Sequence, residues 1–307
     1  TEQVAITMEV MKRLREDVSD YLLLDNGTLF LNMAYEEVGY PTVFCGKKKY
    51  FMTPHVESIN FYPEDLFVKG IDIIKQGQAK IVQKIGHEFM HEVVSPENEL
   101  DLISIAVRKI KQYYGAKLDT TLFVMKAKYK PDKKNIPVLK FVERMRLERE
   151  RYSGDPTLAA LYDPPEAGDK FDYVIVKKEM QYTLRGTMEP TTKGDQMEYF
   201  RVYLASLATP NPMKLDLNYY MKRATVGIFA RFIAYHPDFQ PAGDKAMMDL
   251  TVKENYKAMD KHCVDAATKF LTDICDQTTG YDRVNVAKIG RKWQQIYRTA
   301  MKEINAD

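Results

Sequence analysis

The spacing of apolar residues changes near Pro63, and this change constrains the fold more than any other feature of the sequence. Before Pro63, one helical pattern is followed by short β-branched and aromatic runs bounded by glycines, which are typical of strands. Beyond it, apolar residues recur mostly at helical spacing. We therefore predict an α+β fold, in which a small β-containing part precedes a mostly helical part with a short strand pair. The predicted helices cover residues 4–26, 64–94, 99–114, 136–152, 215–234, 249–276 and 284–304. The predicted strands cover residues 28–33, 41–44, 173–176 and 180–184. A loop is predicted over residues 187–197.

Length and composition are those of an ordinary folded protein. At 307 residues, with 45% apolar and 29% charged side chains, the chain can bury one or two cores. Its formal charge of +2 is the difference between 45 basic and 43 acidic residues. A charge this small creates no strong global field, so binding to nucleic acid would have to come from local clusters of basic side chains.

Neither a membrane span nor a secretion signal is predicted. No apolar run approaches the length that crosses a bilayer, and the N-terminus lacks the pattern of a signal peptide. Cys45, Cys263 and Cys275 are scattered without Cys-x-x-Cys spacing, which favours neither a disulfide framework nor a thiolate metal site. We therefore expect a reducing compartment and thiols that serve as small core residues.

Residues 36–50 join a strand-like run to Lys47, Lys48 and Lys49, followed by Tyr50. Three adjacent ammonium groups repel one another, and a phosphodiester backbone neutralises them while it releases condensed counterions. The tyrosine adds a donor that can reach a sugar or a base edge. This segment therefore indicates a grip on nucleic acid; the alternative is a solvated turn, which is what most lysine runs form.

The same segment resembles the end of the palm in family B DNA polymerases, where a strand carrying Glu-x-Val is followed at fixed distance by Lys-Lys-x-Tyr. Glu36 and Val38 match the first part, and Lys47, Lys48 and Tyr50 match the second. Three further matches follow in the order of the family. They are Lys69-Gly70-Ile71-Asp72 at the start of the thumb, Gly168-Asp169-Lys170 leading into the strand of residues 173–176, and Asp216, Tyr219, Tyr220 and Arg231 at the end of the thumb.

Within the family, residues 26–28, 33–38 and 70–78 are most similar to the polymerases of asfarviruses and related large DNA viruses. The resemblance implies a division of the chain into three parts. These are the end of the palm (1–65), the thumb (66–240) and a helical extension or the end of the thumb (241–307).

The resemblance also implies that the basic segment and the palm-to-thumb junction hold primer-template DNA near the primer end. Lys48 and Tyr50 are expected to sense the minor groove, and Lys49 is expected to meet phosphate. Glu36 would lie near the metal site without being a principal ligand, and Gly70 could equally form a simple turn. The implied DNA-binding residues are Lys47, Lys48, Lys49, Tyr50, Lys69 and Gly70.

The carboxylates with which the family holds two Mg²⁺ ions for nucleotidyl transfer do not occur in this sequence. Both the Asp-x-x-Ser-Leu-Tyr-Pro-Ser segment and the Tyr-Gly-Asp-Thr-Asp-Ser segment are missing. We therefore expect the chain alone to be inactive and to need an upstream polymerase half that carries the aspartates and Mg²⁺. A sliding clamp is a further partner that such a polymerase can use. The expected location is an intracellular viral replication site, in the cytoplasm of the host cell more than in the nucleus.

A non-catalytic DNA-binding or processivity module derived from such a thumb is an alternative function. The two functions differ in what an upstream half would do. A polymerase part would restore primer extension when it is combined with that half, whereas an independent module would bind DNA without stimulating it.

Residues 87–91 match His-Glu-x-x-His, the zinc-binding motif of metallopeptidases, through His87, Glu88 and His91. Catalytic zinc needs a third protein ligand, and the sequence supplies no recognisable one. The extended form of the motif would need a histidine at position 97, where Glu97 stands. A zinc metallopeptidase is therefore a weaker alternative, and we expect both histidines to face solvent without a metal.

Other patterns predict packing instead of binding. Charges of both signs alternate along the predicted helix of residues 136–152, so its arginines are expected to form ion pairs on a solvated face. Tyr173 is expected in the core. Trp293 lies at helical spacing with Ile289, Ile296 and Tyr297, which favours a core stripe.

Overall fold

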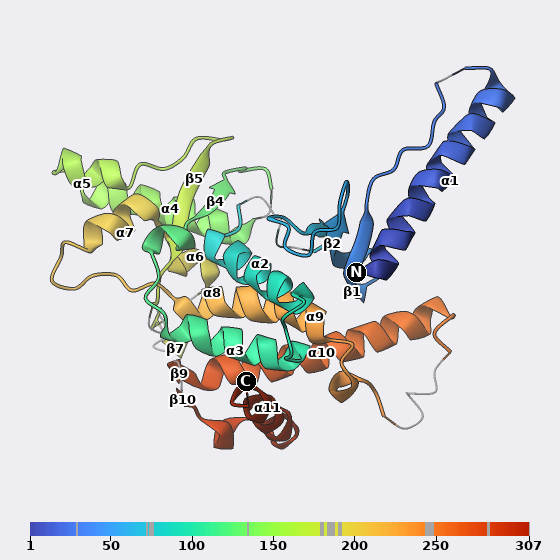
Figure 1. Cartoon of the computed structure of the whole chain (residues 1–307). Coiled ribbons are helices and arrows are strands. Elements are labelled where there is room, and N and C mark those ends of the chain that lie inside the picture. Colours follow the sequence, from blue (N-terminus) through green and yellow to red (C-terminus); the bar gives the residue numbers. More distant parts are fainter. Residues whose placement is uncertain are drawn as a thin grey trace.

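The computed structural model describes residues 1–307 apart from residues 29, 72, 74–76, 134, 179–180, 183–187, 190–191, 243–248, 281–282 and 307. As predicted, the fold is of the mixed α+β class, with small antiparallel sheets set among helices (Figure 1). The α-helices are α1 (Glu2–Asn26), α2 (Lys80–Val94), α3 (Leu102–Gly115), α4 (Ile136–Arg151), α5 (Pro156–Leu161), α6 (Lys193–Gln196), α7 (Phe200–Ser206), α8 (Leu217–Ala224), α9 (Ala230–Ile233), α10 (Lys253–Gln277) and α11 (Arg291–Ile304). The strands are β1 (Val38–Gly46), β2 (Lys49–His55), β3 (Phe67–Lys69), β4 (Met125–Lys128), β5 (Lys170–Ile175), β6 (Gln181–Tyr182), β7 (Met188–Glu189), β8 (Met197–Tyr199), β9 (Thr278–Gly280) and β10 (Arg283–Val284). Short helical turns are η2 (Thr120–Phe123), η3 (Thr225–Phe229), η4 (Pro237–Phe239) and η6 (Val286–Lys288).

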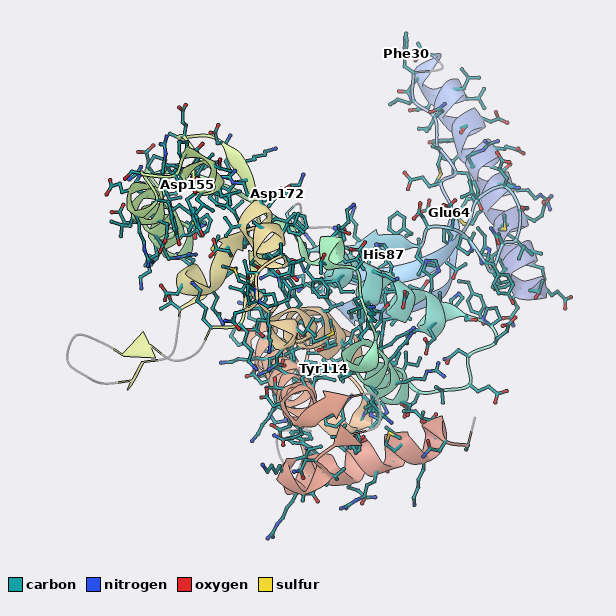
Figure 2. The ribbon with its side chains drawn as sticks, turned by 90° about the vertical axis from the view of Figure 1, so that its left-hand side faces the viewer. Phe30, Glu64, His87, Tyr114, Asp155 and Asp172 are labelled. Atoms are coloured by element: carbon teal, nitrogen blue, oxygen red, sulfur yellow. The ribbon has the colours of Figure 1, made fainter. Side chains whose placement is uncertain are left out.

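Helix α1 is the predicted N-terminal helix, and it projects from the body of the molecule (Figure 1). Within this fully described helix, only Val4 and Met8 are buried. The strand predicted at residues 28–33 is wrong, because no described strand includes these residues. The chain returns along α1 instead, where the Met33 N–H donates to the Ser19 hydroxyl at 3.1 Å. Phe30 lies near the C-terminal end of α1, where this helix projects farthest from the body (Figure 2), and no sheet edge among the described strands is close enough for its segment to join.

The first sheet has the order β1–β2–β3 and contains the predicted strand of residues 41–44 within β1. Along β2, Phe51, Thr53 and His55 are buried, whereas the residues between them are partly exposed. This alternation means that one face of the sheet belongs to the core and the other faces solvent. On the inner face, the Phe51 ring lies 5.2 Å from the ring of Phe232 in α9.

The helix predicted over residues 64–94 is correct only from Lys80 onwards. Its first part contains β3, which pairs antiparallel with β2 through Tyr50 and Lys69, Phe51 and Val68, and Met52 and Phe67. An apolar run this short shows no clear period, and the open edge of β2 decides its conformation.

In the second sheet, β5 lies between β4 and β8, and Tyr173 faces both Met125 and Tyr199. The predicted pairing of residues 173–176 with residues 180–184 is therefore wrong. Part of the latter segment lies outside the described residues, and β6 within it pairs with β7. The predicted loop of residues 187–197 is also partly wrong, because it contains β7, α6 and the start of β8.

The core lies between the first sheet and the long helices. Phe89 of α2 lies 4.3 Å from Phe229 and 5.1 Å from Phe232 by ring centroids. Tyr173 is buried, as predicted. One cluster of buried side chains runs from Cys45 to Ala300. The division into parts 1–65, 66–240 and 241–307 stays a prediction.

The C-terminal helices α10 and α11 pack against the same core. Phe239 lies 5.6 Å from Phe270 of α10 and 5.9 Å from Trp293 of α11. The predicted core stripe is confirmed, since its members are buried. They are Ile289, Trp293, Ile296 and Tyr297.

Helix α8 continues through a π-helical turn, η3, into α9, so the predicted helix of residues 215–234 is largely confirmed. The Thr225 hydroxyl donates to the Met221 carbonyl at 2.7 Å beside this turn. The wider turn changes the direction of the residues that follow it, including Arg231.

The cysteines are core residues, as predicted. The arginines of α4 form the predicted ion pairs, but only three of these pairs lie on a solvated face, because the partner of Arg144 is buried. All three cysteines are free and buried. On α4, Arg144 pairs with Glu198 of β8 at 3.0 Å. Exposed pairs join Arg146 to Glu143, Arg149 to Asp163 and Arg151 to Glu148. Among the described residues, no helix is both long and apolar enough to cross a membrane.

Candidate nucleic-acid interface

The basic segment forms the tip of the β1–β2 hairpin. Gly46 pairs with Lys49, which leaves Lys47 and Lys48 as the turn. Both turn lysines are exposed, whereas Lys49 and Tyr50 are half-buried. A phosphate in solvent can therefore reach the turn, and the strands hold the turn in a fixed place.

The outer face of the first sheet carries a row of aromatic rings beside a lysine. Tyr50 lies between Phe44 of β1 and Phe67 of β3, with ring centroids 5.9 Å and 6.0 Å away. Lys69 is directly opposite Tyr50 in the β2–β3 register and is exposed. Aromatic rings can contact sugars and base edges, while an ammonium group neutralises phosphate. We call Phe44, Tyr50, Phe67 and Lys69 the aromatic face.

The Lys49 side chain lies on the face of the hairpin opposite to Tyr50, because successive side chains of a strand point to opposite faces. With Gly70 and Arg231, it lines a hollow of about 220 Å³ between the hairpin and the α8–α9 helix. The structure therefore brings Tyr50 and Lys69 together on one face and separates Lys49 from them.

Gly70 lies against the hairpin turn. Its φ is +70°, and an added Cβ would lie 2.1 Å from the Lys48 carbonyl oxygen. Lys48 itself has a φ of 60°, which is uncommon for a residue with a side chain. Only glycine therefore fits at position 70, against the hairpin turn. This is the role in a turn that the sequence offered as one of two possibilities for Gly70. A DNA contact by Gly70 stays a prediction.

Three side chains from α9, α10 and the segment between them lie beside the hairpin tip, next to Gly46. The Arg231 Nη1 atom lies 2.6 Å from the Asp260 Oδ1 atom, and the Tyr235 hydroxyl donates to the same oxygen. An added Cβ at Gly46 would lie 3.4 Å from Arg231 Nη1 and 3.8 Å from Asp260 Oδ1. Burial and the hydrogen bond to Asp260 raise the pKa of Tyr235, so its hydroxyl keeps the donated proton. We call Arg231, Tyr235 and Asp260 the hairpin brace.

Glu36 lies at the opposite end of β1 from the hairpin tip and is exposed. A strand rises about 3.3 Å per residue, so its backbone is on the order of 30 Å from the turn lysines. The structure does not bring Glu36 together with the lysines, and its place near a metal site stays a prediction.

The His-Glu-x-x-His match lies on α2 (Figure 2 labels His87), and its two histidines are half-buried instead of facing solvent as predicted. Glu88 is engaged elsewhere: it accepts from the Tyr113 hydroxyl and lies 3.6 Å from Lys109 Nζ. Burial and the nearby His87 lower the pKa of His91. Across the part of the chain that the structure describes, no three His, Cys, Asp or Glu side chains gather as ligands for a metal ion. The described residues therefore fit neither a zinc centre nor a carboxylate set for Mg²⁺.

Sequence reasoning missed the flanking rings Phe44 and Phe67 and the acidic member of the brace, Asp260. The alternation along β1 could have indicated Phe44, because it leaves this ring on the face opposite buried Cys45. Asp260 has no such signal, since only the packing of α10 against α9 brings it to Arg231.

Comparison with protein-family models matches residues 1–234 to DNA polymerase family B. The matched region includes the hairpin, both three-stranded sheets and Arg231, and it ends before Tyr235 and Asp260.

The chain is also similar to proteins named DNA polymerase beta from African swine fever virus. It is 35% identical over 315 residues to the polymerase of isolate Tick/Malawi/Lil 20-1/1983, which covers 99% of this chain and 24% of that protein. For isolate Pig/Kenya/KEN-50/1950, the identity is 35% over 316 residues, with 99% and 25% covered. The chain thus spans about a quarter of the length of these relatives, and the similarity extends through α10 and α11.

Proposed function

Since this chain belongs to DNA polymerase family B, we propose that it is the C-terminal part of a viral DNA-directed DNA polymerase and holds primer-template DNA. One observation supports this most directly: the register places Lys69 opposite Tyr50, on the face where Phe44 and Phe67 flank that ring. Accessible aromatic rings beside an exposed ammonium group suit a nucleic-acid backbone and its sugars, and here Phe44 is exposed while Tyr50 and Phe67 are half-buried.

The roles of the lysines follow from their positions. Lys48 at the turn and Lys69 on β3 are exposed and can neutralise phosphates at the edge of a duplex. Tyr50, stacked on Phe67, can lie along a sugar or a base edge in the minor groove. Lys49 faces the α8–α9 helix, so it would meet a phosphate only on that side of the hairpin.

Nucleotidyl transfer in this family uses Mg²⁺, which stabilises the charge on the transferred phosphate. The described residues do not supply its ligands. We therefore place the catalytic aspartates and Mg²⁺ on an upstream part of the polymerase, with a sliding clamp as a further partner and the cytoplasm of the host cell as the site of replication. This chain contributes the grip on the product side of that reaction.

The grip is tested by replacing two lysines. Lys48→Ala/Lys69→Ala removes two ammonium groups that neutralise phosphate, so the affinity for primer-template DNA should fall at every sequence tested. The slope of log affinity against log salt should become shallower by about 0.9 for each phosphate that is no longer neutralised. Fluorescence anisotropy titrations of the 307-residue chain at several salt concentrations measure both quantities.

A matched control is Lys257→Ala/Lys302→Ala, which removes the same charge from exposed positions on α10 and α11. This variant should keep the wild-type slope. If the two double variants behave alike, the lysines of the hairpin are not the interface.

Adding the upstream polymerase part separates the two candidate functions. Restored primer extension in the mixture supports a polymerase part. Duplex binding without any primer extension would instead favour the independent DNA-binding module.

A further inference from the structure

We infer that the hollow between the hairpin tip and the start of α10 binds one unpaired nucleotide. This inference extends the proposed function, because the hollow adjoins the aromatic face and shares Lys47 with the basic segment. The hollow also reaches into the part of the chain that the family match does not cover. It therefore gives residues 241–307 a role in contact with DNA.

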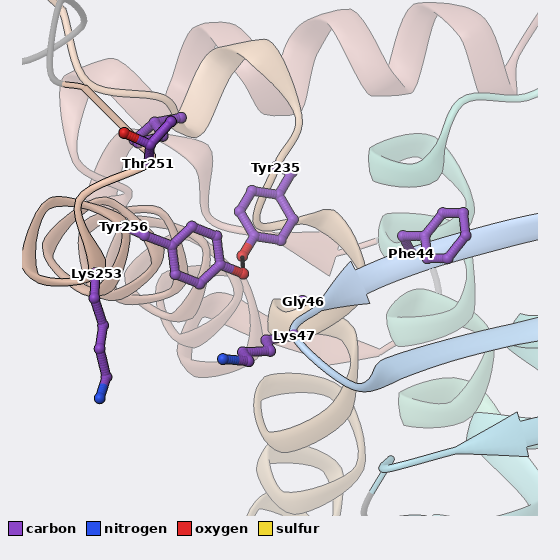
Figure 3. Close-up of a pocket in the computed structure, with 8 residues that line it drawn as sticks. Phe44, Gly46, Lys47, Tyr235, Thr251, Lys253 and Tyr256 are labelled. Carbon is purple, nitrogen blue, oxygen red and sulfur yellow. Dashed lines mark hydrogen bonds between the residues drawn. The ribbon is translucent and has the colours of Figure 1, made fainter.

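The hollow has a volume of about 720 Å³ (Figure 3). This is the size of a small-molecule site, so a single nucleotide fits it and a duplex does not. Its walls come from three places that are far apart in the sequence. They are Phe44 and Lys47 on the hairpin, Tyr235 after α9, and Thr251, Lys253 and Tyr256 at the start of α10.

The side chains in these walls match the parts of a nucleotide. The Tyr256 and Phe44 rings offer faces on which a base can stack, and such stacking tolerates any base. Lys47 and Lys253 are exposed ammonium groups that can pair with a phosphate. The Thr251 hydroxyl adds a neutral donor and acceptor. Among the described residues that line the hollow, none carries a carboxylate that would repel phosphate.

The Tyr256 ring of the hollow is linked to the hairpin brace. The Tyr256 hydroxyl lies 3.3 Å from the Tyr235 hydroxyl, which donates to Asp260 (Figure 3 shows the two phenols meeting). Asp260 is neutralised by Arg231 at 2.6 Å. Because these partners are already in place, a base that stacks on Tyr256 meets a ring that is already ordered.

The hollow is also continuous with the proposed DNA grip. Phe44 lines the hollow and lies 5.9 Å from Tyr50 by ring centroids. A strand that follows the aromatic face therefore passes Phe44 before it reaches Lys47. A nucleotide that has lost its pairing partner at that point can leave the duplex and enter the hollow, because its exposed base gains a stacking surface.

The test uses 2-aminopurine, whose fluorescence is quenched when the base stacks. The 307-residue chain is titrated with a blunt duplex and with duplexes that carry one unpaired 2-aminopurine nucleotide at the 3′ end or the 5′ end. We expect quenching with at least one unpaired end. We also expect roughly tenfold tighter binding of that duplex than of the blunt one.

Two variants assign this effect to the hollow. Tyr256→Leu keeps the apolar volume but removes the stacking ring, and Lys253→Ala removes an ammonium group. Each should abolish most of the preference for the unpaired end while the affinity for the blunt duplex stays unchanged. Lys257→Ala, on an exposed position of the same helix outside the hollow, should keep the preference. Equal quenching in the wild type and both variants would overturn the inference.

Free 2-aminopurine deoxyribonucleoside monophosphate distinguishes the source of the nucleotide. Quenching of the free monophosphate assigns the hollow to mononucleotides as well as to DNA ends, and quenching of the tethered base alone assigns it to DNA. A blunt duplex that binds without any preference for unpaired ends refutes the nucleotide site but leaves the grip intact. If the blunt duplex fails to bind while free nucleotide is quenched, the grip is refuted and the nucleotide site stands.

Discussion

At the residue scale, the position of the turn lysines depends on a residue without a side chain. The Lys48 carbonyl oxygen approaches Gly70 so closely that an added Cβ would lie 2.1 Å from it. Since the obstacle is backbone, it cannot rotate away as a flexible side chain would. Gly70 thus couples the segment that follows β3 to the direction of the turn.

Gly70→Ala should displace the hairpin turn and destabilise the fold. Alanine at a φ of +70° is strained, and its methyl group would collide with the turn, so we expect a loss of about 1 kcal/mol or more in the free energy of unfolding. Affinity for primer-template DNA should fall in parallel. Urea denaturation and anisotropy titration measure the two effects.

Gly154→Ala is the matched control, because an added Cβ at this exposed position meets nothing within 4 Å. We expect its free energy of unfolding to stay the same or rise slightly. Equal behaviour of the two alanine variants would show that the turn tolerates a side chain at position 70.

At the scale of elements, a buried ion pair joins helix α4 to the second sheet. The Glu198 side chain is 3% exposed, and Arg144 Nη1 lies 3.0 Å from its Oε2 atom. Arg144 also donates to the Met197 carbonyl. The other α4 arginines pair on the surface, where solvent screens the interaction.

Arg144→Ala should therefore cost far more stability than a change at its neighbour on the same helix. Leaving the Glu198 carboxylate buried without its cation costs about 3 kcal/mol or more in the free energy of unfolding. Arg146→Ala breaks an exposed pair with Glu143 and should cost less than about 0.5 kcal/mol. Urea denaturation of both variants checks this ratio, and similar losses would contradict it.

The long helices could be predicted from the sequence because their signal is local. The sequence predicts α4 to within one residue, and α1 ends at Asn26 as expected from Gly27. The failures concern short apolar runs whose conformation depends on a distant partner. Residues 67–69 form a strand because β2 offers them an edge, whereas residues 30–33 find none.

The same distinction applies to the candidate site. Lys47, Lys48 and Tyr50 are nearly contiguous, so a motif identifies them. The pairing of Tyr50 with Lys69 needs the β2–β3 register, and the support from Asp260 needs the position of α10. Spacing along a chain carries no information about either contact.

At the scale of the whole molecule, the C-terminal helices belong to the same core as the hairpin. Phe239 is fully buried between Phe270 of α10 and Trp293 of α11. The buried cluster continues from these rings to Phe51 under the first sheet. The end of the family match at residue 234 is therefore not the end of the core.

Removal of residues 241–307 should abolish cooperative unfolding, because it uncovers Phe239 and the buried face of α8–α9. Thermal denaturation followed by circular dichroism, together with binding of a hydrophobic dye, measures this. Removal of residues 1–33 is the control, since only Val4 and Met8 of α1 are buried, and it should preserve a cooperative transition. A sharp transition in the C-terminally shortened chain would contradict the prediction.

The position of the brace beside Gly46 has a consequence for measurements of this grip on a shorter fragment. A fragment that stops where the family match stops would retain Lys47, Lys48 and Lys69 but lose Asp260, the carboxylate to which Arg231 is anchored. The cations of the hairpin would all be present, but Arg231 and Tyr235 beside the hairpin tip would have lost their common carboxylate partner. The affinity of such a fragment would report loose charge, whereas the intact chain presents the same charge from a fixed position.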